Sequence, residues 1–461
     1  MQRLDNFSRF DQLRRDFPLF CYEAFHYETT GKSLEISFHF SLSEDIHFRP
    51  KISIPWKQNL FIPYENLSSS ALDNLIFHMG MIELISYWKA ACPQKVVIKP
   101  FRLTGEQEDF WKKLYYLGLG EFFHMNSIET NEEEFMHIVF EEKPLPSKFS
   151  FDPAPGSLLP VGGGKDSAVS AGLLNRWKAG WVPFVINPRG ATREVLLAAG
   201  KSGQDTIVIN REIDQMLLKL NGQGFLNGHT PFSALLAFYS LLVSYLTGRA
   251  SIVLSNESSA NEPTIPGTDI NHQYSKSFGF EKDFRDYYNH FISPGFNYYS
   301  LLRPLSELQI ARIFSSMPEY FSSFRSCNAG SKSDSWCGAC PKCLFTFIIL
   351  SPFLEPAQLE NIFGKNLLNN NHLRGILDEL TGIAKIKPFD CIGTVEEVNM
   401  ALDAAMERYD PDNLPVLLQY YKSTGNSWPE IKVPLENITA MNETAHFVPS
   451  EYNKLLHRAI S

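Results

Sequence analysis

The chain has 461 residues, of which 44% are hydrophobic and 20% are charged, and its formal net charge is −9. This balance is typical of a folded globular protein, and the length favours two or three domains over a single core. The negative charge and the lack of a Lys/Arg run argue against a nucleic-acid partner, so we expect a small-molecule partner.

The first residues of the chain have no signature of export. Residues 1–17 carry charges throughout and lack the apolar segment of a secretory signal, so we expect a cytoplasmic protein. The longest uncharged stretch, 228–248, contains His229, Pro231 and several hydroxyl side chains. That composition favours a buried helix over a membrane span, and no membrane partner is expected.

The N-terminal third alternates between two kinds of pattern. Residues 22–56 alternate apolar and polar side chains and predict antiparallel strands. Residues 69–92 and 105–123 have helical periodicity, with serines at 68–70 as possible caps. The Pro-rich segment 141–156 closes this part of the chain, so we predict a separate α+β domain over residues 1–150.

From residue 157 onward, strand-like and helical segments alternate. Such alternation predicts a parallel sheet with right-handed crossovers, whose ligands bind at the carboxyl ends of the strands. The expected strands are 157–161, 182–188, 205–210 and 251–256, and the expected helices are 165–179, 192–200 and 230–247.

Three consecutive glycines, Gly162, Gly163 and Gly164, lie between the first of these strands and its helix. Backbone amides and the positive end of a helix converge at such a turn, which favours a bound phosphate. The Walker and dinucleotide-binding patterns are both excluded, because their required glycines are not in place. The stretch GGGKDS (162–167) instead resembles the PP-loop of ATP pyrophosphatases, Ser-Gly-Gly-x-Asp-Ser, with Gly162 replacing the first serine.

This resemblance implies that the loop binds ATP with Mg²⁺ and that ATP is cleaved between its α and β phosphates. Lys165 would neutralise the phosphates and Ser167 would donate a hydrogen bond to them. Asp166 is either a catalytic group or a simple first-turn partner of the helix dipole. Asn187 stands where such folds bind adenine and ribose, although an Asn-Pro turn explains it equally well. The ATP-binding residues are then Gly162, Gly163, Gly164, Lys165, Ser167 and Asn187.

Four of the seven cysteines lie between residues 327 and 343. Their spacing suits a tetrahedral structural zinc site, and Gly338 permits the turn between them. An iron–sulfur cluster is the alternative, although Phe347 stands where a ferredoxin would have its fourth cysteine. The arrangement is similar to the zinc knuckle of 7-cyano-7-deazaguanine synthases. The expected ligands are Cys327, Cys337, Cys340 and Cys343.

These features together predict an α/β fold. Its centre is a parallel-sheet PP-loop core of the adenine nucleotide alpha hydrolase type, over residues 151–350 and including the cysteines. The N-terminal α+β domain precedes this core, and a mainly helical region over residues 351–461 follows it.

Residues 257–285 form a long polar segment with little periodicity, which predicts a functional loop after the last strand. A solvated loop would have the same composition. We assign to substrate binding Glu257, Asn271, Gln273, Tyr274, Ser275 and Lys276.

Several motifs occur in a fixed order over most of residues 80–400, namely ISYWKAACP, GGGKDS, NGHTPF, SNESS, NHQYSKS, SCN with WCGACPKC, and PFDCIGT. In this combination the chain is similar to the MurL family of UDP-N-acetylmuramoyl-L-alanyl-L-glutamate epimerases. The resemblance implies an isomerase of cell-wall precursor synthesis that acts on a nucleotide-sugar dipeptide. It would adenylate a carboxylate of the terminal L-glutamate with ATP, invert the α-carbon and release AMP and diphosphate.

Two other functions remain open, namely a different PP-loop ligase resembling 7-cyano-7-deazaguanine synthase and an ATP-binding protein without turnover. The group that exchanges the proton also remains open among His272, His229, Lys276, Tyr274, Glu257 and Cys391. The two histidines rank first, because an imidazole titrates near neutral pH. The predicted catalytic residues are Lys165, Asp166, Ser167, His272, His229 and Lys276.

Overall fold

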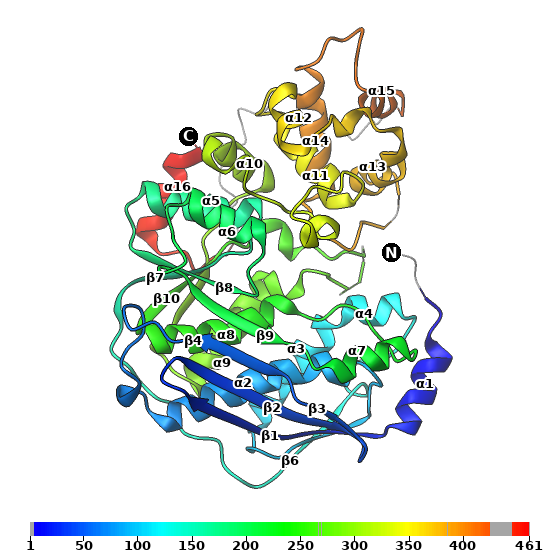
Figure 1. Cartoon of the computed structure of the whole chain (residues 1–461). Helices are drawn as coiled ribbons and strands as arrows, with labels where there is room; N and C mark the ends of the chain where they lie inside the picture. The colour runs from blue at the N-terminus through cyan, green and yellow to red at the C-terminus, as the bar shows by residue number, and fades with distance from the viewer. Residues whose placement is uncertain (1–3, 266, 269, 385, 425–444, 461) are drawn as a thin grey trace.

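The computed structural model describes residues 4–265, 267–268, 270–384, 386–424 and 445–460 (Figure 1). Eleven strands form one sheet, in the order β11-β10-β7-β8-β9-β4-β2-β1-β5-β6, with β3 paired to β2. The prediction of a mixed α/β fold is confirmed. Six strand pairs in this sheet are parallel and four are antiparallel.

The antiparallel strands predicted in the N-terminal third are present. Strand β2 alternates buried and half-buried side chains, as expected for a strand with one face on the core. A short helix, α1 (Phe7–Asp16), precedes them, and two parallel strands extend the sheet beyond β1. The strands are β1 (Leu19–Thr29), β2 (Ser33–Leu42), β3 (Ile46–Phe48), β4 (Lys51–Pro55), β5 (Lys95–Ile98) and β6 (His137–Phe140).

The first long helix, α2 (Ser69–Trp88), begins where the sequence indicates. The Ser68 side chain accepts a hydrogen bond from the backbone N–H of Ala71 and so caps it. The single helix expected over 105–123 is instead two, α3 (Gly105–Gly118) and α4 (Gly120–Met125). Glycines flank the break, and glycine weakens a helix interior.

The predicted alternation of strand and helix from residue 157 is confirmed, with all neighbouring strands of this half parallel. Several helix ends differ from the predicted ones by two or more residues. For example, α8 begins at Phe232, after Pro231, whereas the prediction began at residue 230. The strands are β7 (Ala154–Pro160), β8 (Trp181–Ile186), β9 (Ile207–Glu212), β10 (Arg249–Leu254) and β11 (Asn297–Ser300). The helices are α5 (Lys165–Arg176), α6 (Gly190–Ala198), α7 (Gln215–Gly222), α8 (Phe232–Thr247) and α9 (Phe278–Phe291).

The central sheet separates two hydrophobic cores. Neighbouring residues of one strand point to opposite sides, so Leu158 belongs to one core and Leu159 to the other. Figure 1 shows α2, α8 and α9 on one face and α5 and α6 on the other. The apolar helix α8 is buried, as its composition predicts.

Strands β4 and β9 pair antiparallel and join the N-terminal strands to the parallel strands. A buried ion pair supports this junction, because Arg211 of β9 donates to Glu83 of α2 at 2.5 Å. The predicted N-terminal domain and the predicted core therefore contribute strands to one sheet. The domain boundaries at residues 150 and 350 stay predictions.

The described part of the C-terminal region is mainly helical, as predicted, and residues 425–444 of that region lie outside the described residues. Most of its helices gather above the sheet, while α16 returns to α5, where Tyr452 stacks on Trp177 (Figure 1). None of the helices in the described parts of the chain is long and apolar enough to cross a membrane. The helices of this region are α12 (Pro356–Phe363), α13 (Arg374–Thr381), α14 (Val395–Met406), α15 (Val416–Ser423) and α16 (Ser450–Ile460), and α10 (Glu307–Ser315) and α11 (Pro341–Leu350) precede them.

Candidate active site

The order of the strands creates a crevice beside the glycine loop. The chain runs from β7 to β8 and β9 and then returns to β10 on the other side of β7. At such a reversal the carboxyl ends of the two strands diverge and leave room for a ligand. A cavity of about 330 Å³ lies there and is lined by Gly162 and Gly164 after β7 and by Ser255 and Asn256 after β10.

The glycine loop turns sharply at Gly163, which has a φ of +89°. A Cβ atom there would lie 2.7 Å from the backbone nitrogen of Thr192, so the turn and the close approach both require glycine. The loop is also held from a distant segment, because the backbone N–H of Arg325 donates to the carbonyl of Gly163 at 2.8 Å.

We expect Gly163→Ala to lower the free energy of unfolding by about 1–3 kcal/mol, because alanine is strained at this φ and its Cβ meets the backbone of α6. Gly162→Ala is the matched control. At Gly162, no atom of the described chain lies within 4 Å of an added Cβ. Urea unfolding of both variants measures the difference, and equal stability of the two would contradict this account of the loop.

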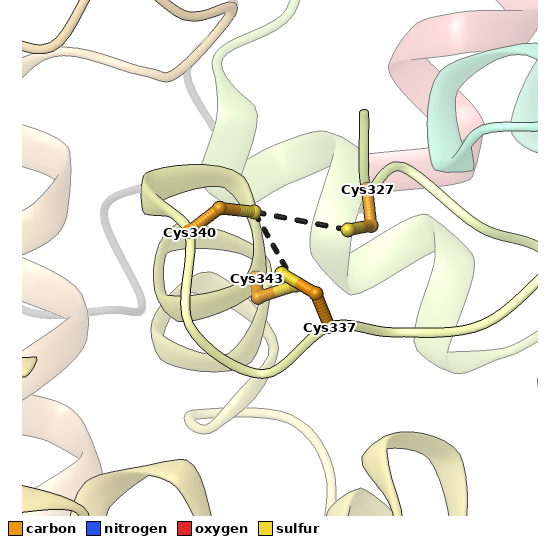
Figure 2. Close-up of side chains that lie close together, drawn as sticks. All are labelled: Cys327, Cys337, Cys340 and Cys343. Carbon is orange, nitrogen blue, oxygen red and sulfur yellow. Dashed lines mark hydrogen bonds between the residues drawn. The ribbon is translucent and has the colours of Figure 1, made fainter. Parts of the chain in front are cut away.

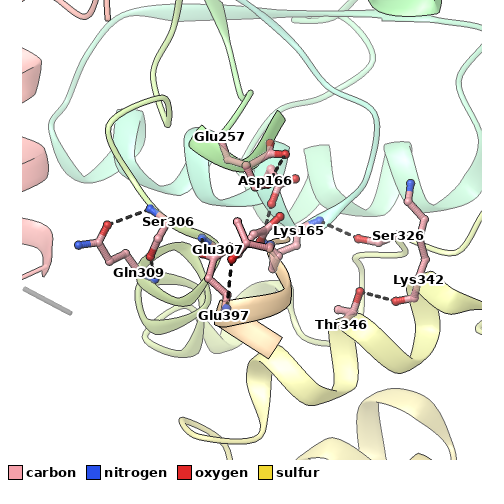
Figure 3. Close-up of polar contacts among 12 residues, drawn as sticks. Lys165, Asp166, Glu257, Ser306, Glu307, Gln309, Ser326, Lys342, Thr346 and Glu397 are labelled. Carbon is pink, nitrogen blue, oxygen red and sulfur yellow. Dashed lines mark hydrogen bonds and ion pairs between the residues drawn. The ribbon is translucent and has the colours of Figure 1, made fainter. Parts of the chain in front are cut away.

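Lys165 begins α5, is almost fully buried and lines the cavity, and Figure 3 shows it among its acidic neighbours. Its ammonium contacts Glu307 at 2.7 Å and Asp166 at 2.5 Å. Burial by itself disfavours the ammonium, but the charges of Asp166 and Glu307 raise the pKa of Lys165 above its ordinary value. Lys165 is therefore a fixed positive charge beside the glycine loop.

Two other predicted ATP-binding residues have local partners. The Ser167 hydroxyl donates to the carbonyl of Gly164 at 3.0 Å, while Ser167 also lines the cavity. Asn187 is not brought to this cavity. Its side chain donates to the carbonyl of Arg211 at 2.8 Å and accepts from the N–H of Arg211 at 2.7 Å, which ties β8 to β9.

Asp166, Glu257 and Glu307 bring one carboxylate oxygen each within 4.8 Å of the others. Burial raises the pKa of Glu257, and the nearby Asp166 carboxylate adds to the effect. Carboxylate oxygens at this spacing could hold a hard divalent cation such as Mg²⁺. Figure 3 shows Glu257 and Asp166 side by side, with Glu307 below them between Lys165 and Glu397.

A buried arginine fixes the chain segments that supply Glu257 and Lys276. Arg303 donates to the carbonyl of Glu257 at 2.6 Å and to the carbonyl of Lys276, and it pairs with Glu281 at 3.1 Å. Its side chain is fully buried. Because it bridges two loop segments, Arg303 determines where the Lys276 side chain enters the cavity.

The predicted substrate loop over 257–285 ends earlier than expected. Helix α9 begins at Phe278, where the Ser277 hydroxyl accepts from the N–H of Phe280. Asn271 folds the loop on itself by donating to the carbonyl of Ala260 and accepting from the N–H of Gln273. Of the residues assigned to substrate binding, Lys276 lines the cavity of the glycine loop, whereas Gln273, Tyr274 and Ser275 are part of the loop over 257–277.

The two predicted catalytic histidines lie together against one carboxylate. Nδ1 of His229 is 3.2 Å from a Glu121 oxygen, and Nδ1 of His272 contacts the same oxygen. A ring nitrogen of each histidine and a Glu121 oxygen lie within 4.8 Å of one another, and we interpret the Nδ1 contacts as hydrogen bonds. Burial lowers the pKa of His229 to about 4. His272 behaves differently, because hydrogen bonds to Cys391 and Glu121 outweigh burial and raise its pKa to about 9.

The four clustered cysteines bring their sulfur atoms within 4.8 Å of one another. Sγ of Cys340 is 3.8 Å from that of Cys327 and 3.5 Å from that of Cys343, as drawn in Figure 2. Gly338 has a φ of +62°, in keeping with its predicted role in the turn. The spacing suits a tetrahedral metal ion with four thiolate ligands.

Several residues of the site could not be found from the sequence. Glu307 and Ser326 contact Lys165 from positions 142 and 161 residues away. Glu121 lies 151 residues from His272. The only available signal was for Ser326, which is the first residue of the SCN motif of the cysteine cluster.

The comparisons with known proteins divide the chain into two consecutive regions. The family model of the MurL N-terminal domain matches residues 11–301, and that of the MurL C-terminal domain matches residues 322–432. No solved structure gives a significant match. The chain belongs to the MurL family, as the order of its motifs predicts.

Three curated relatives each carry the name UDP-N-acetyl-alpha-D-muramoyl-L-alanyl-L-glutamate epimerase. The protein from Xanthomonas oryzae pv. oryzae is 34% identical over 76% of this chain and 81% of its own length. The proteins from Salinispora tropica and a Micromonospora species are 33% and 32% identical over 88% of this chain, and over 89% and 91% of their own lengths. The expectation of an isomerase agrees with these names.

Proposed function

We propose that the protein epimerises the terminal L-glutamate of UDP-MurNAc-L-Ala-L-Glu in an ATP-dependent reaction of peptidoglycan precursor synthesis. One observation carries the proposal. The glycine loop with Lys165 and a pair of reactive side chains, Lys276 and Cys391, line the same cavity. A site that both activates a carboxylate and moves a proton needs these two sets of groups around one substrate.

The first step activates the substrate. An oxygen of the glutamate α-carboxylate attacks the α-phosphorus of ATP, the bond to the bridging oxygen breaks, and diphosphate leaves with the electron pair. Lys165 stabilises the negative charge on the phosphates, and the positive end of the α5 dipole favours the same charge. The product is an acyl-adenylate.

Activation explains why an epimerase would use ATP. A proton on a carbon next to a carboxylate is very weakly acidic, because its removal creates a second negative charge beside the first. The acyl-adenylate has lost that first charge, so an ordinary side chain can remove the proton. Hydrolysis then gives the D-glutamyl product and AMP.

The carboxylates of Asp166, Glu257 and Glu307 fit a role in holding Mg²⁺. Their mutual repulsion, of which Lys165 compensates a part, would be relieved by a divalent cation. Bound Mg²⁺ would neutralise charge on the phosphates of ATP.

The four cysteines fit a structural zinc ion, because protein thiolates would fill all four positions. A zinc ion bound by these cysteines would fix the position of Cys327. Cys327 lies two residues beyond Arg325, whose backbone N–H donates to the glycine loop.

The test is to incubate the protein with ATP, Mg²⁺ and UDP-MurNAc-L-Ala-L-Glu, and to measure diphosphate, AMP and the configuration of the glutamate. We expect diphosphate and D-glutamyl product in equal amounts. Diphosphate with retained L-glutamate would favour another PP-loop ligase. The absence of substrate-dependent diphosphate would refute the proposed enzyme.

A further inference from the structure

We propose that Cys391 is the base that removes the α-proton, with Lys276 and His272 as its positively charged partners. This inference rests on the proposed function and assigns the proton transfer within it. It also replaces the ranking from sequence, which placed the histidines first.

Cys327 and Cys391 both line the cavity of the glycine loop, and of these two only Cys391 lies outside the four-cysteine cluster. Four cysteines form the cluster, and Cys21 and Cys92 are buried in the N-terminal half. Cys391 lines the cavity that holds the glycine loop and is partly exposed. Its thiol is therefore within the space where the activated glutamate would lie.

Two cationic side chains approach this thiol. Nζ of Lys276 lies 3.1 Å from Sγ of Cys391, and His272 forms a hydrogen bond with the thiol. Burial by itself disfavours a thiolate, but the nearby cations, above all Lys276, lower the pKa of Cys391 well below its ordinary value. Cys391 is thus ready to accept a proton at neutral pH.

Glu121 completes the arrangement by holding Nδ1 of His272. The order of contacts, carboxylate to imidazole to thiol, is the one that orients and activates a nucleophile or base in many enzymes. His272 with its raised pKa is already protonated at neutral pH and cannot itself take the proton. We assign to His272 a positioning role.

The α-proton moves from carbon to sulfur. The Cα–H bond of the acyl-adenylate breaks, an S–H bond forms on Cys391, and the electron pair moves into the acyl group as an enolate. A proton from water then adds to the opposite face of Cα, and the thiol returns its proton to solvent. The net result is inversion, with one solvent hydrogen on the α-carbon.

The decisive variants are Cys391→Ala and Cys391→Ser, with Cys21→Ala as the control outside the site. In D₂O, both Cys391 variants should lose far more of their Cα exchange than of their diphosphate release. Deuterium incorporation at Cα and D-glutamyl formation should fall by about 10²–10⁴-fold. Cys21→Ala should retain all three activities.

Unchanged deuterium incorporation in a folded Cys391 variant would overturn the assignment. Loss of diphosphate release together with exchange would also overturn it, because the residue would then serve activation. A wild-type protein that makes no D-glutamyl product would instead refute the proposed function, so the two failures are distinguishable.

A second measurement uses the wild-type protein and does not depend on the folding of a Cys391 variant. Iodoacetamide at pH 6.5 should alkylate Cys391 faster than Cys21, as measured by peptide mass spectrometry, because a thiolate is the reacting species. His272→Gln should slow this alkylation and the Cα exchange together. Equal alkylation of Cys391 and Cys21, or an alkylation rate unaffected by His272→Gln, would contradict the proposed thiolate.

Discussion

Lys165→Met should reduce ATP-dependent release of diphosphate by at least about 10²–10³-fold, the usual effect of removing one preorganised charge-stabilising donor. The same change leaves Glu307 buried without its 2.7 Å partner. A buried charge without its counter-ion costs roughly 3–5 kcal/mol, so this variant should also unfold at a lower temperature. Activity and thermal unfolding must therefore be measured together.

The double variant Lys165→Met/Glu307→Gln separates the two effects. It removes both charges of the buried pair, so its unfolding temperature should lie closer to that of the wild type than that of the single variant. Its diphosphate release should remain as low as in Lys165→Met. A folded double variant with wild-type diphosphate release would show that Lys165 does not act on the phosphates.

Cys340→Ser should remove most of the bound zinc and destabilise the protein strongly. Structural zinc contributes about 10–16 kcal/mol of apparent binding energy in small zinc-binding peptides, and loss of one thiolate forfeits a large part of it. Because the cluster lies beside the Arg325 contact to Gly163, diphosphate release should fall as well. Elemental analysis of zinc per chain and a thermal unfolding curve check the prediction.

Cys21→Ser is the matched control for this change, since Cys21 is a buried cysteine far from the cluster in strand β1. It should keep the full zinc content. Full zinc retention in Cys340→Ser would refute the four-ligand site, and iron with inorganic sulfide in the wild-type protein would show that the cluster is an iron–sulfur site.

Local patterns in the sequence predicted most of the secondary structure. The alternation of apolar runs and helical stretches after residue 157 is a short-range signal, and the structure places β7, β8, β9 and β10 there in a parallel sheet. Two of the differences from prediction also have local causes. Gly118 and Gly120 divide the helix expected over 105–123, and the Ser277 cap starts α9 inside the segment predicted as a loop.

The groups that face one another in the site could not be predicted in this way. Lys276 and Cys391 are 115 residues apart, and no periodicity relates them. Their contact depends on Arg303, which fixes the Lys276 loop, and on the packing of the C-terminal helices, which brings Cys391 over the cavity. The sequence therefore included Cys391 among six possible bases without a reason to prefer it.

The sequence by itself determined the glycine turn, the cysteine spacing and the family, because each is encoded in residues close together in the chain. The tertiary structure alone decided that β4 joins β9 in one sheet, that Glu307 neutralises Lys165, and that Glu121, His272 and Cys391 form one line of contacts. These pairings join residues more than 100 positions apart. Such contacts follow from how whole elements pack, and packing is decided by shape and burial over the entire molecule.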